Sequence, residues 1–121
     1  MSTAHDPDDQ LVIRRKAGVN VVGFTNPYLQ SEEASTKAGE ALMALIEGKE
    51  EPKLILSFDG VRFVSSSMIA QVVRLHKAVA KAKGKLRLCG LLPAVRDVLH
   101  ASHLDRLLDV HDDEASALKD F

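Results

Sequence analysis

The sequence predicts a single α/β domain with a mixed, mostly parallel sheet of about five strands and with four helices. Short β-rich runs alternate with longer stretches of helical periodicity, which is typical of a mainly parallel sheet with helices packed against it. One apolar run is nearly continuous, as expected of a strand that is buried on both faces. The chain has 121 residues, of which 45% are hydrophobic and 27% charged, so it can form one core and not two.

The first part of the chain predicts a tail and a pair of strands. Residues 1–10 are polar and acidic, which predicts a flexible N-terminal tail before a domain spanning residues 11–121. Two β-rich runs, 11–15 and 19–25, are separated by Gly18. This pattern is typical of a hairpin or of two adjacent strands.

A first helix is expected after Asn26 and Pro27, where the proline removes a backbone donor and ends the strand. Ser31 can cap the helix, and the glutamates that follow it suit the positive end of the helix dipole. Gly48 is a plausible residue just beyond the C-terminal end. The apolar stripe of this helix is expected to comprise Ala34, Ala38, Ala41, Leu42, Leu45 and Ile46.

The middle of the chain predicts the buried strand and a second helix. Residues 54–58 form the nearly continuous apolar run. A serine run at 65–67 then opens a helix that is expected to extend to about Lys83 and to end at Gly84. Its apolar face is expected to comprise Ile69, Val72, Val73, His76, Val79 and Ala80.

The last third predicts two more strands and two more helices. A strand is expected at 85–89, and Pro93 suits the first position of a third helix. A short strand is expected at 107–110, and the acidic run at 112–114 suits the start of a terminal helix. Cys89, the single cysteine, is expected to be a small core residue and cannot form an intramolecular disulfide.

Charge is unevenly placed along a chain whose formal net charge is −1. Residues 31–51 contain six acidic residues and two lysines, whereas residues 60–96 contain eight basic residues and no acidic one. The first helix is therefore acidic and the second basic. Either these are two neighbouring solvated faces that attract each other, or the basic helix is a docking surface for an acidic partner.

Several functional classes are disfavoured. The nearly neutral total argues against a nucleic-acid binder held by bulk charge. The turn at 64–68 lacks the glycines of a nucleophile elbow, and no glycine-rich phosphate loop occurs. His100 and His103 have helical spacing but no third ligand nearby, so neither a metal nor a cofactor is expected. The absence of a long apolar run or signal segment predicts a cytoplasmic protein that is not itself a membrane protein.

The serine run at 65–67 has two interpretations. A hydroxyl before a helix can simply cap the free backbone N–H groups. Alternatively, an exposed serine at this point can accept phosphate, because a helix N-terminus stabilises an anion. The phosphate would add about −1.5 to −2 charges to a binding surface without distorting the fold.

Several features from residue 54 to residue 118 together resemble the STAS family, the sulfate transporter and anti-sigma factor antagonist domains. The resemblance covers nearly the whole chain. The features are the buried strand before Phe-x-x-Ser-Ser at 63–67, Lys-x-Lys-Gly-Lys at 81–85, Leu-Arg-Leu-Cys-Gly at 86–90, Pro-x-Val at 93–95 and Leu-Asp-Arg-Leu at 104–107.

The resemblance implies a small cytoplasmic α/β domain that works by binding. In bacterial antagonist members, the unphosphorylated domain binds an anti-sigma factor that is itself a serine kinase, and phosphorylation of a serine breaks the complex. The family's usual turn reads Asp-Ser-Ser-Gly. Aligned on Phe63, it places Ser65 at the aspartate, Ser66 at the phosphoacceptor, Ser67 at the second serine and Met68 at the glycine.

We therefore expect a regulatory binding module and not an enzyme, with an anti-sigma factor, a serine kinase or a related regulatory protein as its partner. Ser66 is the expected phosphoacceptor, Ser67 the second choice and Ser65 the helix cap. The sequence leaves open whether the chain forms a homodimer. The expected partner-binding residues are Asn26, Tyr28, Arg62, Phe63, Ser65, Ser67, Met68, Gln71 and Arg74.

Two alternatives come from the same residues. The chain can be a scaffold subunit of a signalling complex or of a lipid transporter, without phosphorylation and with Met68 in the interface. The altered turn, which has Ser65 for the aspartate and Met68 for the glycine, favours this reading. The other alternative is a nucleotide-binding protein or enzyme, for which the sequence shows no phosphate cradle.

Overall fold

The computed structural model of the protein describes residues 11–25, 28–29, 31–119 and 121. The tail expected at 1–10 and the expected partner residue Asn26 lie outside the described residues. The elements in chain order are β1 (Leu11–Lys16), β2 (Val19–Phe24), β3 (Tyr28–Leu29), α1 (Glu32–Ile46), β4 (Lys53–Ser57), β5 (Phe63–Val64), α2 (Ser66–Lys81), β6 (Lys85–Cys89), α3 (Pro93–Ala101), the 3-10 turn η1 (Leu104–Arg106), β7 (Asp109–His111) and α4 (Glu114–Leu118).

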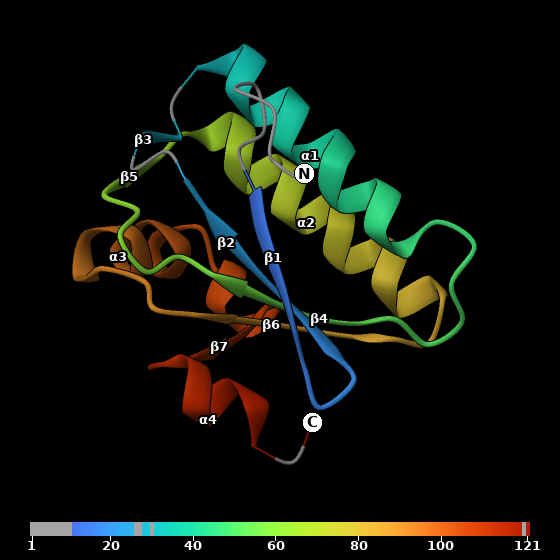
Figure 1. The fold of residues 1–121 in the computed structure, drawn as a ribbon. Coiled ribbons are helices and arrows are strands. Elements are labelled where there is room, and N and C mark those ends of the chain that lie inside the picture. The colour runs from blue at the N-terminus through green and yellow to red at the C-terminus, as the bar shows by residue number, and fades with distance from the viewer. Residues whose placement is uncertain (1–10, 26–27, 30, 120) are drawn as a thin grey trace.

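The predicted fold class is confirmed. The main sheet has five strands in the order β1-β2-β4-β6-β7. The first two strands form an antiparallel hairpin, and all other neighbours in this sheet are parallel. Helices α1, α2 and α3 pack on one face of the sheet, and the short α4 covers the other face (Figure 1).

The central strand β4 explains why the sequence contains a nearly continuous apolar run. Leu54 and Leu56 face the helices α1 and α2 in the main core, whereas Ile55 faces α4 in a smaller second core. All three side chains are completely buried. A strand covered on both faces buries side chains of both orientations, so its middle loses the usual alternation of polar and apolar residues.

Caps and turns place the helix ends close to the predicted positions. Ser31 caps α1, with its hydroxyl accepting from the backbone N–H of Ala34 at 2.9 Å. The second helix stops at Lys81, two residues before the expected end. Gly84 follows, at a point where a Cβ atom would collide with Pro52, so only glycine fits.

Two parts of the chain differ from the prediction. The strand expected at 107–110 begins two residues later, at Asp109. His103 adopts a left-handed conformation and η1 follows it, so the chain enters the sheet later than the apolar pattern suggests. A second, two-stranded parallel sheet, β3 with β5, was not predicted, because strands of two residues are too short to show a period.

Candidate functional site at the start of α2

The serine run lies at the N-terminal end of α2, where the structure separates the roles of its three members. Ser65 is the N-cap, and its hydroxyl accepts a hydrogen bond from the backbone N–H of Met68 at 3.2 Å. This confirms the predicted cap. Ser66 is the first helical residue and is exposed, whereas Ser67 is partly buried. Of the three hydroxyl groups, the one on Ser66 is therefore the most open to another protein.

The electrostatics of this end of the helix favour an anion. The first backbone N–H groups of a helix lack partners within the helix and carry the positive end of its dipole. The first turn of α2 contains no acidic residue that would neutralise them. A phosphate attached to Ser66 would consequently be stabilised and would not disrupt the helix.

A buried hydroxyl from α1 supports the cap. Ser35 is completely buried, and its Oγ lies 3.3 Å from the Oγ of Ser65 in a hydrogen bond between the two helices. The contact fixes the start of α2 against α1. Sequence analysis missed Ser35, because a serine within a small-residue stripe carries no signal of its own until the partner helix is placed.

Two aromatic side chains flank the start of α2 on the side of the small sheet. Tyr28 on β3 pairs directly with Phe63 on β5, two residues before Ser65. Their exposed fractions are 48% for Tyr28 and 47% for Phe63. The whole chain has only five aromatic residues, four Phe and one Tyr, so two half-exposed aromatic residues at paired positions of neighbouring strands are a pronounced feature. Rings of this kind are enriched at protein–protein interfaces.

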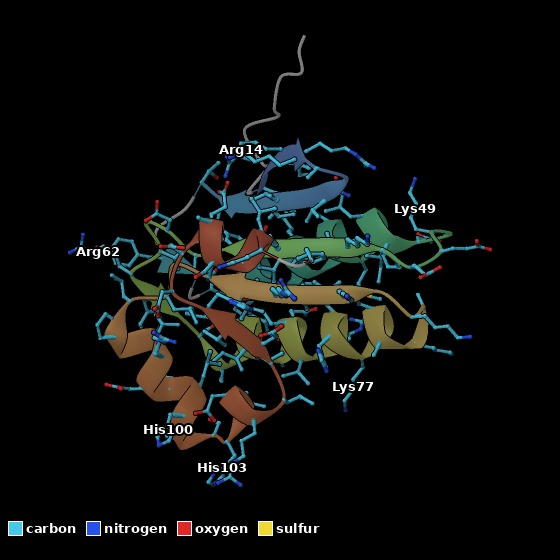
Figure 2. All side chains as sticks on the ribbon, turned by 90° about the horizontal axis from the view of Figure 1, so that it is seen from below. Arg14, Lys49, Arg62, Lys77, His100 and His103 are labelled. Carbon is cyan, nitrogen blue, oxygen red and sulfur yellow. The ribbon has the colours of Figure 1, made fainter. Side chains whose placement is uncertain are left out.

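The expected charged and polar residues lie at different distances from this point. Arg62 is exposed next to Phe63, and its side chain extends away from the body of the molecule (Figure 2). Arg74 is also exposed, but it lies more than two turns along α2. Gln71 packs against α1, where a Cβ at Gly39 would collide with it. The structure thus brings Tyr28, Arg62 and Phe63 to the serine run and places Gln71 at the helix–helix contact.

One expected partner residue is corrected by the structure. Met68 was expected to present a bulky apolar side chain to a partner, but it is completely buried in the main core. The reason is its position in α2, where it shares the inward stripe with Val72, Leu75 and Val79. The Met68 side chain therefore serves packing and cannot contact a partner.

The two histidines with helical spacing, His100 and His103, do not share a helix. The third helix ends at Ala101, so His103 lies beyond it. His103 has a left-handed backbone conformation and directly precedes η1. His100 instead contacts Asp105, with 2.7 Å between Nδ1 and Oδ2. This hydrogen bond raises the pKa of His100 and lowers that of Asp105. In the described part of the chain, no three His, Cys, Asp or Glu residues gather as metal ligands would.

Two smaller expectations are met. Cys89 is 1% exposed in the second core, and burial raises the pKa of its thiol. His76, expected on the apolar stripe of the second helix, is partly buried on α2. Within the described residues, no helix has both the length and the apolar character needed to cross a membrane.

Comparisons with known proteins agree with this geometry. A family model described as the STAS domain matches residues 30–117. The chain therefore belongs to the STAS domain family. An anti-sigma F factor antagonist from Paenibacillus polymyxa is 25% identical over 73 residues, which cover 60% of this chain and 62% of that protein. The matched part is thus less than two thirds of that relative's length.

Solved structures show the same fold over most of the chain. An anti-sigma-factor antagonist (STAS) domain protein from Planctomyces limnophilus has a TM-score of 0.82 and 25% identity, covering 89% of this chain and 94% of that one. The phosphorylated form of SpoIIAA, a Bacillus cell fate determinant, has a TM-score of 0.65 and 18% identity, covering 87% and 94%. The present chain is thus an STAS domain that resembles anti-sigma factor antagonists.

Proposed function

We propose that this protein is a cytoplasmic regulatory module that binds a serine-kinase anti-sigma factor, or a related regulator, and performs no chemistry itself. Its docking surface comprises the aromatic pair Tyr28 and Phe63, the adjacent Arg62 and the start of α2. The observation that carries the proposal is the exposed Ser66 at an anion-stabilising helix end, beside two half-exposed aromatic rings. Similarity to proteins named as anti-sigma factor antagonists supports the class of partner.

Phosphorylation of Ser66 is the proposed switch. The added charge would meet the docked partner at the edge of the aromatic pair and displace it by repulsion and by the cost of burying a charge. The fold would stay intact, because the helix end accommodates the anion. A solved STAS neighbour is described in a phosphorylated form, which supports this class of regulation.

The alternative that the chain is a scaffold subunit depended mainly on an exposed Met68. That interpretation placed Met68 in a constitutive interface, whereas Met68 lies in the core. The serine that replaces the family's aspartate retains the capping function, because the Ser65 hydroxyl already accepts from Met68. Neither departure from the usual turn therefore removes the exposed acceptor at Ser66.

The first test is phosphopeptide mass spectrometry on the protein isolated from its own cells under several growth and stress conditions. We expect phosphate on Ser66 in an amount that changes with the condition. Persistent absence, at full coverage of the peptide that contains residues 65–67, would remove the switch from the proposal.

A second test separates docking from phosphorylation. Wild type, Ser66→Ala, Ser66→Asp and Phe63→Ala are each used to capture partners from the same cells. We expect wild type and Ser66→Ala to retain a protein with a serine-kinase domain, and the other two variants to lose it. Aspartate suits the first turn of a helix, so Ser66→Asp stays folded, as thermal unfolding will verify. Equal capture by Ser66→Asp would contradict the charge-repulsion mechanism.

A further inference from the structure

The outer surface formed by α1 and α2 carries opposite charges on its two helices. One exposed face of α1 carries three glutamates spaced seven residues apart. They are Glu33 and Glu40 within the helix and Glu47 at its C-terminal cap. The single cation within α1, Lys37, lies 3.5 Å from Glu33. Glu40 and Glu47 are therefore left as outward-facing carboxylates without a partner of their own among the described residues.

The second helix carries the matching cations. Arg74, Lys77 and Lys81 occupy positions i, i+3 and i+7 of α2, and all three are exposed. The side chain of Lys77 points away from the molecule (Figure 2). No acidic residue occurs on α2 at all. This helix therefore presents an uncompensated basic stripe.

The two stripes belong to one continuous surface. The helices run parallel and side by side over the same face of the sheet (Figure 1), since each connects neighbouring parallel strands. Ser35 lies opposite Ser65, and Gly39 lies opposite Gln71. Along the common axis, Glu40 is therefore within one turn of Arg74, and Glu47 falls at a level between the two lysines of α2.

Apart from the Glu33–Lys37 pair, the charged side chains of this surface form no ion pair among the described residues. Across the residues that the structure describes, no ion pair joins α1 to α2, although the helices are in contact. On the opposite face of the sheet, by contrast, Glu114 pairs with both Arg14 and Lys16. The two helices, which one interpretation of the sequence described as solvated faces that attract each other, are therefore neighbours without a direct ion pair between them in this part of the chain.

We propose that the α1–α2 surface binds a second copy of this chain. A two-fold axis parallel to the helices places α1 of each copy on α2 of the other at the same level. The acidic stripe of each copy then faces the basic stripe of the other copy. The dimer therefore contains two equivalent contacts and is symmetric. A purely acidic partner or an anionic membrane would be repelled by the carboxylates of α1, so a copy of the chain complements this surface better.

The expected dimer is weak and sensitive to salt. Helices of 15 and 16 residues are roughly 22–24 Å long, and two of them side by side are about 20 Å wide, so their footprint is on the order of 450 Å² per copy. A standard stable interface buries about 800 Å² per partner. Exposed ion pairs contribute mainly to orientation and specificity. The contact therefore forms at high protein concentration and is lost when salt screens the charges.

The test is sedimentation equilibrium of the full chain over a range of concentrations, at about 0.02 M and about 0.5 M salt. At low salt we expect the average mass to rise from the 13.2 kDa of one chain towards twice that value. At high salt the self-association should weaken at least tenfold. A monomer at every concentration in low salt would overturn the proposal.

A charge-swap experiment assigns the surface. Glu40→Lys with Glu47→Lys makes both helices basic, and Lys77→Glu with Lys81→Glu makes both acidic. We expect each variant alone to be monomeric and an equimolar mixture of the two to form a heterodimer. A matched control, Asp97→Lys with Arg106→Glu, alters exposed residues away from these helices and should dimerise like wild type. Unchanged dimerisation of either swapped variant, or no association in the mixture, would place the contact elsewhere.

The two proposals can fail separately. Dimerisation is measured on the purified chain alone, whereas docking at Phe63 and Ser66 is measured by capture of another protein. A Phe63→Ala variant that dimerises normally but loses the captured protein would separate the two surfaces. Loss of dimerisation in Phe63→Ala would overturn the assignment to α1 and α2.

Discussion

The two faces of the central sheet are covered in different ways. On one face, the helices α1, α2 and α3 bury a large apolar core, and α1 and α2 keep their charged side chains outside. On the other face, a helix of five residues covers a small core and is held by charged side chains. Arg14 and Lys16 of β1 both reach Glu114 at its start. Charged side chains therefore stabilise the fold on the α4 face, whereas those on the α1–α2 face are available to partners.

Arg87 shows how the α4 face uses its charge. Its guanidinium lies 3.2 Å from Asp109, donates to the carbonyl oxygens of Ala117 and Lys119 at 2.8 and 2.7 Å, and stacks over the ring of Phe121 at 4.7 Å. A short helix cannot bury enough apolar area to hold itself, so a planar, five-donor side chain supplies the anchor. Residues of this kind are not available for docking a partner.

The largest loss of stability is expected from a substitution of Met68, in the core between the sheet and α2. Replacing it by alanine leaves a cavity in the core beneath α2 and should lower the free energy of unfolding by about 2–5 kcal/mol. The volume-conserving change Met68→Leu should cost less than about 1.5 kcal/mol. Urea denaturation measures both. A loss below about 1 kcal/mol for Met68→Ala would contradict the buried position, because an exposed methionine costs little to remove.

On the α4 face, the largest effect is expected at Arg87. Its side chain is 14% exposed, and Arg87→Ala removes its hydrogen bonds together with the aromatic contact. We expect a loss of about 1.5–3 kcal/mol, again from urea denaturation. The matched control is Arg96→Ala, whose ion pair with Asp112 is exposed and should contribute about 0–1 kcal/mol. Equal losses for the two arginines would show that the anchor around Arg87 adds nothing.

A smaller effect is expected at the cap that links α1 to α2. Ser65→Ala removes the bond to the Met68 N–H and the contact with Ser35, and should cost about 1 kcal/mol. Ser65→Asp keeps a capping oxygen and should retain most of this stability. The pair is measured by thermal unfolding, together with Ser67→Ala as a neighbour that does not cap. Stability of Ser65→Ala equal to that of wild type would show that the cap contributes nothing to α2.

The sequence predicted most of the fold because its signals are local. Ser31 and Ser65 cap the helices where expected, and the apolar run at 54–58 becomes the doubly covered strand β4. Signals that depend on tertiary placement were missed. Tyr28 and Phe63 were expected to bind a partner, but their direct pairing could not be read from residues 35 positions apart.

Met68 shows why part of the site could not be predicted. The resemblance to the family's turn places it at a glycine, two residues after the predicted phosphoacceptor Ser66, which suggested an exposed side chain. The helical phase of α2 decides otherwise, since Met68 lies one turn before Val72 and two turns before Leu75 on the buried stripe. Burial of a residue in the first turn depends on where the helix meets the sheet, which is a matter of tertiary packing.

The smallest effect expected is the pH dependence contributed by Glu114. Hydrogen bonds from Lys16 and Arg14 hold the pKa of this carboxyl below its ordinary value. Its contribution to stability is therefore complete above the pKa of the unfolded chain, about 4.3, and is lost as the pH falls through the lower folded value. Glu114→Gln should remove this part of the acid dependence while leaving the charges of α1 and α2 untouched. Unfolding curves from neutral pH to about pH 3 measure it, with Glu33→Gln on the outer surface as the control. An unchanged acid slope in Glu114→Gln would mean that the paired cations of β1 do not hold α4 through charge, and the contrast between the two faces would then rest on Arg87 alone.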